Sequence, residues 1–413
     1  MEPLSGIFRK PGHIILFLAL LQVFCSTYLL KIEGFQAVNS FLFLLSGTGI
    51  SFFILKIPSL KFEKELLLNK QVFFKLIFIL LLLPVSYYLS QQIMDKTPLE
   101  KEYADMLPIM KVMGERFVKG YGGQVYEPIP EIWNGIQPIY LPAMWLPFTS
   151  SLIFHFDMRW VTVCGIWLSV FICVWPGKWK RNILSLFFIA GILILLAWLH
   201  LEKTNNVIRL TEEGVILFYY SLMAVAIISG NPWLIGICAS LCLLSRYAII
   251  GWIPFAGAYL LIKQQYQYFF KAFIAGLATV VILLLPFGIK PLLLHLHLPF
   301  EYINHSERVW NENPEFFYQS LGMAKFLGAG NTHLLHYILL TGVFTIPFLF
   351  LFFIKKKIIP INIALLSGFQ LSITFFYNFL DVSYLYLYYT PVFISLTIAG
   401  WLFAAESNNK NVV

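Results

Sequence analysis

Long apolar runs recur along almost the whole chain, and this pattern limits the possible folds more than any other feature. A helix needs about 20 mostly apolar residues to cross the hydrocarbon core of a bilayer, and about twelve runs come near that length. Only 12% of the 413 residues are charged, whereas a soluble domain carries roughly 25%. The sequence therefore predicts an all-α, multi-pass integral membrane protein. The expected spans are 14–30, 38–55, 71–90, 160–176, 183–200, 214–229, 233–249, 250–262, 270–288, 334–354, 358–378 and 384–403.

Basic residues gather in short loops between the runs, and they indicate how the chain is oriented. With a cytoplasmic N-terminus, 16 of the 29 Lys and Arg residues but only 4 of the 21 acidic residues lie on the cytoplasmic side. This is the bias that the positive-inside rule describes. It predicts a cell-membrane protein with both termini in the cytoplasm, and it accounts for the net charge of +8 without a nucleic-acid partner. The basic loops are 56–70, 177–182, 263–271 and 355–357.

Residues 138–155 are apolar enough to form one more span, but two features argue against it. Pro138, Pro142 and Pro147 would interrupt a straight helix. A span here would also move the basic loops that follow to the outer side. We therefore expect this segment to lie in the outer interface, a depth that suits its Tyr and Trp side chains.

The five cysteines lie inside apolar runs, too scattered to form a metal site. We interpret them as small buried apolar side chains. Nor is there a cluster of His and Asp residues with the spacing of metal ligands. The sequence predicts no metal cofactor, although a divalent ion is not excluded. The cysteines are Cys25, Cys164, Cys173, Cys238 and Cys242.

The orientation leaves two large loops, 91–159 and 289–333, on the outer side. In the first of them, residues 105–119 have the pattern of an amphipathic helix, since Pro108 is tolerated in a first turn. Asp105 would then stand at the N-terminal end, where free N–H groups and the helix dipole favour a carboxylate. It is either a simple helix cap or a general base held at the membrane surface.

The order of residues around this loop resembles the GT-C superfamily of membrane glycosyltransferases. An acidic residue lies about fifteen positions after a span, and a helix that ends in Gly with a Tyr nearby follows. A proline-rich apolar stretch comes next, and then an Arg that opens another span. The similarity is best over about 71–265, and it is closest to bacterial mannosyltransferase-like branches. It rests on Asp105, Gly120, Tyr126, Tyr140, Pro142, Pro147, Arg159, the stretch 229–263 and a weaker echo at 384–393.

The resemblance implies a GT-C-like catalytic module at 71–265, containing outer loop 91–159 and its interfacial helices. Two N-terminal spans (1–70) would precede it, and the C-terminal spans (266–413) with outer loop 289–333 would follow. In that superfamily the acidic residue of the first outer loop is the catalytic base, which implies this role for Asp105. The family often has two adjacent acids there. Here Ala104 precedes Asp105. Glu102, one helical turn back, is one candidate for the second carboxylate, and Asp95, a few residues past the span, is the other.

The implied donor is a polyprenyl-phosphate sugar, so cations near the outer face are candidate phosphate ligands. Arg246 lies inside an apolar run, and ionisable residues in such places are functional candidates. A snorkelling Arg is the alternative. The other candidates for substrate contact could equally belong to solvated or packed loops. They are His200, Lys203, Arg209, Arg308, Tyr126 and Tyr140.

These observations predict an enzyme that transfers a sugar with inversion from a polyprenyl phosphate to a glycan or glycolipid acceptor at the extracytoplasmic face. Two other functions stay open. A transporter or flippase of lipid-linked sugars would have a midplane site and similar halves. An outer-face glycan ligase or polymerase would depend on a late outer loop, where Arg308, His333 and His336 lie.

Overall fold

The computed structural model describes residues 10–58, 70–102, 106–132, 135–176, 183–203 and 206–408, and these form helices and connecting loops without a β-strand. Six helices are long and apolar enough to cross a membrane, and four shorter apolar helices accompany them. The all-helical class is confirmed. The apolar helices agree with a membrane protein, whereas the total of about twelve spans stays a prediction. The six are Pro11–Lys31, Gln36–Ile54, Ile183–Leu201, Tyr266–Phe287, Ala329–Ile354 and Leu385–Phe403.

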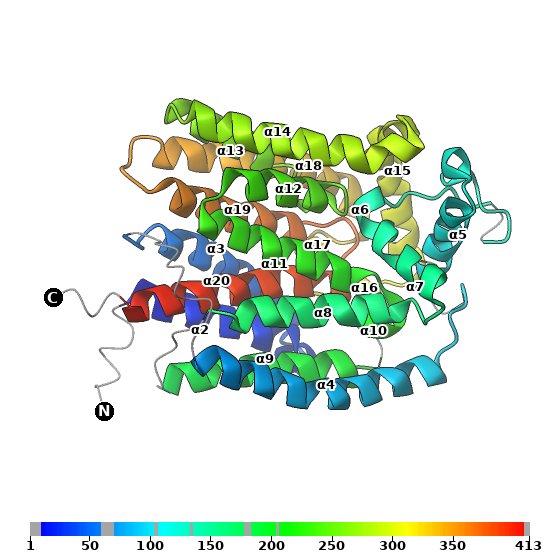
Figure 1. The fold of residues 1–413 in the computed structure, drawn as a ribbon, viewed down its shortest axis with the longest axis horizontal. Helices are drawn as coiled ribbons and strands as arrows, with labels where there is room; N and C mark the ends of the chain where they lie inside the picture. The colour runs from blue at the N-terminus through cyan, green and yellow to red at the C-terminus, as the bar shows by residue number, and fades with distance from the viewer. Residues whose placement is uncertain are drawn as a thin grey trace.

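The longer helices lie side by side along one direction and make a single bundle (Figure 1). Each helix satisfies the hydrogen bonds of its own backbone, which is the requirement that lipid imposes. These helices are α2 (Pro11–Ser26), α3 (Gln36–Ile54), α4 (Lys70–Lys96), α8 (Arg159–Val174), α9 (Ile183–Leu201), α11 (Glu213–Ser229), α12 (Pro232–Leu243), α13 (Trp252–Ile262), α14 (Tyr266–Leu284), α18 (Thr332–Ile354), α19 (Ile361–Asn378) and α20 (Tyr389–Asn408).

Shorter elements gather at one end of the bundle, on the right of Figure 1. They come mostly from the two loops that the sequence places on the outer side. They are α5 (Met106–Val118), η3 (Gly122–Gln124), α6 (Pro142–Trp145), η4 (Leu146–Phe148), α7 (Thr149–Phe154), α10 (Val207–Leu210), α15 (Lys290–Glu312), α16 (Glu315–Tyr318), α17 (Ala324–Leu327) and η7 (Ala329–Asn331). The remaining 3₁₀ turns are η1 (Tyr28–Lys31), η5 (Tyr247–Ile249), η6 (Leu285–Phe287) and η8 (Leu385–Tyr388).

The sequence predicts that residues 138–155 do not form one straight helix, and the structure agrees. The prolines instead open short pieces, with Pro142 at the start of α6 and Pro147 inside η4. Proline is tolerated there because the first helical N–H groups have no intrahelical partner. The segment ends at His155, whose left-handed backbone (φ 55°) terminates α7.

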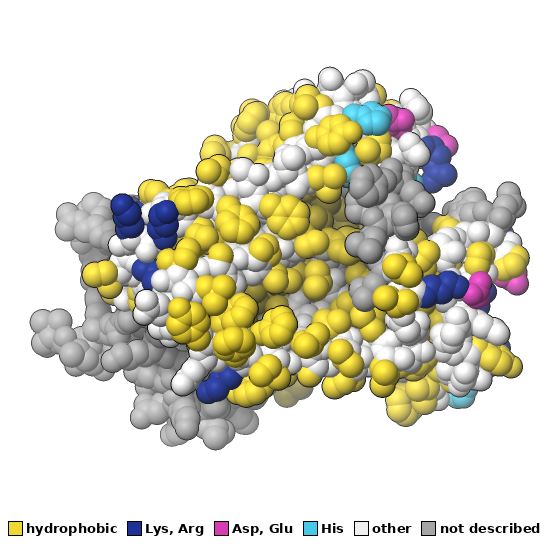
Figure 2. All heavy atoms as spheres, turned by 90° about the horizontal axis from the view of Figure 1, so that it is seen from above, with side chains coloured by type: hydrophobic (Ala, Val, Ile, Leu, Met, Phe, Trp, Pro, Cys, Tyr) yellow, Lys and Arg dark blue, Asp and Glu magenta, His cyan; other side chains and the backbone are white. Residues whose placement is uncertain are grey.

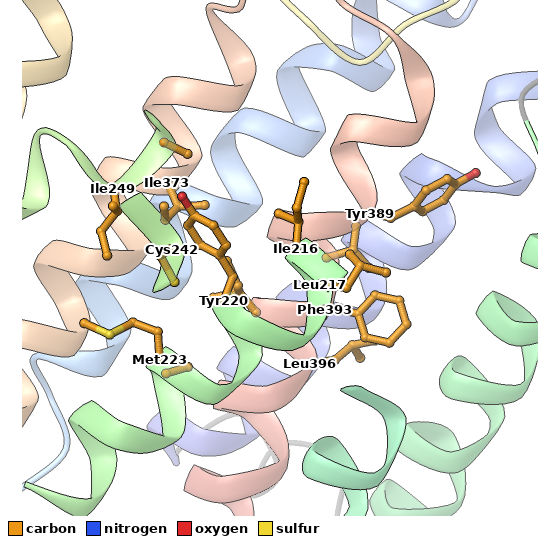
Figure 3. Packing of buried hydrophobic residues seen from close by; sticks show 14 of the residues in the cluster. Ile216, Leu217, Tyr220, Met223, Cys242, Ile249, Ile373, Tyr389, Phe393 and Leu396 are labelled. Atoms are coloured by element: carbon orange, nitrogen blue, oxygen red, sulfur yellow. The ribbon is translucent and has the colours of Figure 1, made fainter. Parts of the chain in front are cut away.

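Helix α11 lies in the centre of the bundle and packs against α8, α12, α19 and α20. Figure 3 shows Tyr220 and Met223 of α11 beside Cys242 of α12, and Leu217 beside Phe393 of α20. These side chains are almost completely buried. The core is therefore built between α11 and helices from both halves of the chain, including the C-terminal helix.

The two terminal helices bring their chain ends to the same end of the bundle. The His13 ring of α2 lies 5.8 Å from the Phe403 ring of α20, centroid to centroid. On the face shown in Figure 2, the surface along the middle is apolar, Lys and Arg side chains lie at both ends, and the Asp and Glu side chains lie at the end away from the termini. The arrangement agrees with a shared side for both termini, and the compartment that each side faces stays a prediction.

Candidate functional site

A buried ion cluster joins the start of α11 to the segment between α12 and η5. Arg246 Nη2 lies 3.1 Å from Glu212 Oε1 and 2.8 Å from Glu213 Oε2. The Glu212 and Glu213 side chains are 2% and 0% exposed, whereas the Arg246 side chain is 16% exposed. Thr390 at the start of α20 donates a 2.8 Å hydrogen bond to Glu213 Oε1. We call Glu212, Glu213, Arg246 and Thr390 the Arg246 cluster.

Close packing of α8 against α11 fixes the two glutamates. A Cβ at Gly214 would lie 2.0 Å from the carbonyl oxygen of Thr162, so only glycine fits at this crossing. Thr162 Oγ1 also donates to the carbonyl of Thr211 at 2.7 Å, directly before the glutamates. The N-terminal end of α11 is therefore held in place by α8, and Glu213 is its first helical residue.

A helix break presents Arg246 to these carboxylates. The sequence pattern suggests one span over 233–249, but α12 ends at Leu243 and Arg246 is extended (φ −156°, ψ 142°). The 12 residues of α12 rise about 18 Å, less than the roughly 30 Å core of a bilayer. The break is stable because its carbonyls find donors: Ala143 N–H bonds Leu244 O at 3.1 Å, and Tyr220 O–H bonds Arg246 O at 2.8 Å.

Both loops that the sequence places on the outer side come close to this cluster. Tyr386 lies within electrostatic reach of Glu212, Glu213 and Arg246, and its hydroxyl contacts Met106 Sδ at 3.6 Å. Met106 is the first residue of α5 in the first loop. Tyr302 of α15, in the second loop, lies within electrostatic reach of Arg246.

Arg246 bonds the two glutamates through a single nitrogen of its guanidinium, Nη2. Arg246 Nε has no hydrogen-bond partner among the described residues, and part of the side chain is exposed. The cluster can therefore hold a guanidinium in a fixed position while leaving one of its donors for another group.

The predicted base, Asp105, lies outside the described residues. The structure does describe its neighbour on the chain, since α5 begins at Met106 and contacts Tyr386. The amphipathic helix predicted for 105–119 is confirmed over Met106–Val118. Glu102 is exposed and has no role in the Arg246 cluster in the described contacts. Its predicted place beside the base stays untested.

Three candidate cations before α11 have surroundings that the sequence did not indicate. His200 is buried: its Nδ1 lies 2.8 Å from Leu196 O and its Nε2 2.7 Å from Ser86 Oγ, which also accepts a bond from Trp167. Arg209 is half-buried in α10, whereas Lys203 is exposed. The structure thus brings Arg246 together with two glutamates rather than with these three cations.

The candidates in the two large loops form hydrogen bonds within their own loop. Tyr126 is buried and donates from its hydroxyl to the carbonyl of Tyr140 at 2.9 Å, so the two tyrosines fasten the first loop to itself. Arg308 is exposed on α15 and its Nη2 lies 3.1 Å from His305 Nδ1. Each of these roles in substrate binding stays a prediction.

Sequence reasoning missed Glu212 and Glu213, and it considered His336 only for a metal or ligase role. Two adjacent acids at the start of an apolar run are themselves a signal, because carboxylates are rare at membrane depth unless they serve a function. Asp381, between two apolar runs, gives the same signal. The structure places Asp381 Oδ2 2.7 Å from His336 Nδ1 in a second buried pair.

The part of the chain that the structure describes contains no group of three or more His, Cys, Asp or Glu side chains that could hold a metal ion. No protein-family model, curated protein sequence or solved structure matches this chain. The candidate site therefore rests on its own residues.

Proposed function

We propose that this protein is an inverting glycosyltransferase that takes a sugar from a polyprenyl phosphate and transfers it at the extracytoplasmic end of the bundle. The observation that supports the proposal is that both large loops come close to the Arg246 cluster. In the first loop Met106 contacts Tyr386 and Ala143 bonds the carbonyl of Leu244, two residues before Arg246; in the second, Tyr302 lies within electrostatic reach of Arg246. A cation close to two such loops suits a lipid phosphate that carries a sugar.

In the proposed reaction, an acceptor hydroxyl attacks the anomeric carbon of the sugar while the bond from that carbon to the phosphate oxygen breaks. Asp105 takes the hydroxyl proton, an effect worth on the order of 10² to 10⁴ in rate. The polyprenyl phosphate leaves with the bonding electron pair. Arg246 stabilises its charge, held at a fixed position by Glu212 and Glu213.

The test compares purified wild type with Asp105→Asn, which keeps the size of the side chain and removes the base. Each protein receives a panel of labelled polyprenyl-phosphate sugars and a membrane-lipid extract as acceptor. We expect transfer by wild type and a loss of about 10² to 10⁴ in the variant, with donor binding retained. Glu131→Gln is the matched control, since Glu131 is an exposed carboxylate in the same loop. Equal rates in wild type and Asp105→Asn would refute the assignment of the base.

One observation favours a second candidate, a transporter of lipid-linked sugars. The chain between α12 and α13 is broken beside buried charges, and broken helices often form the binding sites of transporters. Vesicle assays separate the two functions. A transporter moves the intact lipid-linked sugar between leaflets without an acceptor, whereas the proposed enzyme changes the sugar's covalent partner.

A further inference from the structure

The second buried pair, His336 and Asp381, has unused hydrogen-bonding capacity. Both side chains are 3% exposed. His336 Nε2 and Asp381 Oδ1 have no hydrogen-bond partner among the described residues. Buried polar atoms are usually hydrogen-bonded, so an unpartnered one calls for an explanation. Here both members of one buried pair have such an atom, and a bound molecule that bonds them both would explain it.

The chemistry of the pair selects the kind of molecule. Asp381 Oδ1 can accept a hydrogen bond, and His336 Nε2 can accept or donate one, depending on where the ring carries its proton. A hydroxyl group both donates and accepts hydrogen bonds, so it can bond both atoms in either case. The hydroxyl groups of a sugar meet this condition and carry no charge.

The position of the pair relates it to the Arg246 cluster. Tyr302 of α15 lies within electrostatic reach of both Arg246 and Asp381. Burial raises the pKa of Tyr302 to about 12, so its hydroxyl stays protonated at neutral pH and can donate a hydrogen bond. Ser306, one turn further along α15, donates to the carbonyl of Asp381 at 2.8 Å. The second loop therefore lies against both buried charge clusters.

We infer that His336 and Asp381 form the sugar-binding subsite, in which they bind hydroxyl groups of the donor sugar while Arg246 holds the phosphate of the same donor. The inference rests on the proposed function and adds to it the orientation of the bound donor. The lipid phosphate lies toward α11 and the helix break, and the sugar lies toward the starts of α18 and the 379–384 segment. His336 and Asp381 would set which sugar is accepted, because a site built to bond a hydroxyl discriminates strongly against its absence.

The experiment measures binding to the purified protein in nanodiscs by calorimetry. The probes are farnesyl phosphate and its mannosyl, glucosyl and galactosyl derivatives. The sugar-dependent gain is the ratio of the affinity for the best derivative to the affinity for bare farnesyl phosphate. We expect Asp381→Asn and His336→Phe to reduce this gain by about tenfold or more, as loss of a buried hydrogen bond implies. Both should bind bare farnesyl phosphate within about twofold of wild type.

Two further variants separate binding from loop structure. Ser306→Ala removes only the bond to the Asp381 main chain and should keep the sugar-dependent gain. His336→Gln retains a side-chain amide near the position of Nε2 and should recover part of the gain that His336→Phe loses. An unchanged gain in Asp381→Asn, or an equal loss for bare and glycosylated probes, overturns the subsite.

The failure of the proposed function gives a different result. Wild type then forms no transfer product. If it still binds the probes, as a transporter of lipid-linked sugars would, the sugar-dependent gain tests the subsite as before. If its function does not involve these lipids, it binds neither farnesyl phosphate nor its derivatives. In that case methyl glycosides of the same three sugars test the subsite alone: binding that Asp381→Asn abolishes supports it, and no glycoside binding by wild type overturns it.

Discussion

Two buried arginines at the same end of the bundle have opposite surroundings. Arg159 donates to Asp157 and to the carbonyls of Thr97 and Met94, and its side chain is 4% exposed. Arg246 donates from Nη2 to two carboxylates, and its side chain is 16% exposed. Its Nε has no hydrogen-bond partner among the described residues.

The difference indicates that Arg159 has a structural role, as a clamp between two helices, whereas Arg246 belongs to a candidate site. Arg159 joins the end of α4 to the start of α8 with every donor group engaged, so it has little left for a ligand. Arg246 spends only Nη2 on the two glutamates. A buried arginine alone therefore indicates little, and its remaining donors decide which reading holds.

The largest effect is expected for Arg246→Gln. Removing the guanidinium leaves two buried carboxylates uncompensated, which should destabilise the fold by about 3–5 kcal/mol. Transfer should fall about 10²-fold or more even at a temperature where the variant is folded. Thermal unfolding and single-turnover transfer measure the two effects separately.

The triple variant Glu212→Gln, Glu213→Gln, Arg246→Gln sharpens this test, since it removes all three charges together. It should recover much of the stability and none of the transfer. Recovery of both would show that Arg246 is a clamp like Arg159.

A smaller effect is expected for Arg159→Gln, and on stability only. The variant loses charge-assisted bonds to Asp157 and to two carbonyls, which should cost about 2–4 kcal/mol. Donor affinity and the rate per folded molecule should stay within about twofold of wild type. A large rise in the donor Kd of folded Arg159→Gln would mean that this arginine also serves the site.

Low pH should weaken the Arg159 clamp. Burial alone would raise the pKa of Asp157, but hydrogen bonds from Arg159 and its charge outweigh burial and hold the pKa below its ordinary value. The stability that this carboxylate contributes is therefore present above about pH 4 and is lost as the pH falls through its pKa in the folded protein. Unfolding temperatures of wild type and Asp157→Asn should converge on acidification. A constant difference down to about pH 2 would contradict the account.

The smallest effect concerns Lys325, a cation that donates only to main-chain carbonyls in the described contacts, those of Gln36, Tyr318 and Ser320. Burial lowers its pKa to about 8. The unfolded chain therefore binds more protons than the folded one between about pH 8 and 10.5, and stability should rise with pH across that window. Lys325→Met should remove this rise. A pH-independent difference between the two proteins would show that Lys325 titrates normally.

Local patterns predicted several parts of this structure. Apolar runs predicted helices, the prolines of 138–155 predicted a broken segment, and α5 begins and ends within one residue of the expected 105–119. The break at Arg246 could not be predicted. Residues 233–249 are apolar apart from Ser240, Ser245 and Arg246, and nothing in their spacing shows that the chain leaves the helix after Leu243.

The sequence by itself determined the all-helical class, because apolar runs of about 20 residues are long enough to cross lipid as helices, which satisfy their own backbone polar groups. The placement of Lys and Arg predicts which loops share a side of the membrane. Only the tertiary structure decided what Arg246 faces. Its partners lie 33 and 34 residues away, and Met106 meets Tyr386 across 280 residues. Such contacts depend on how α8, α11 and α20 pack, and helical periodicity records which face of a helix is apolar but not which helix covers it.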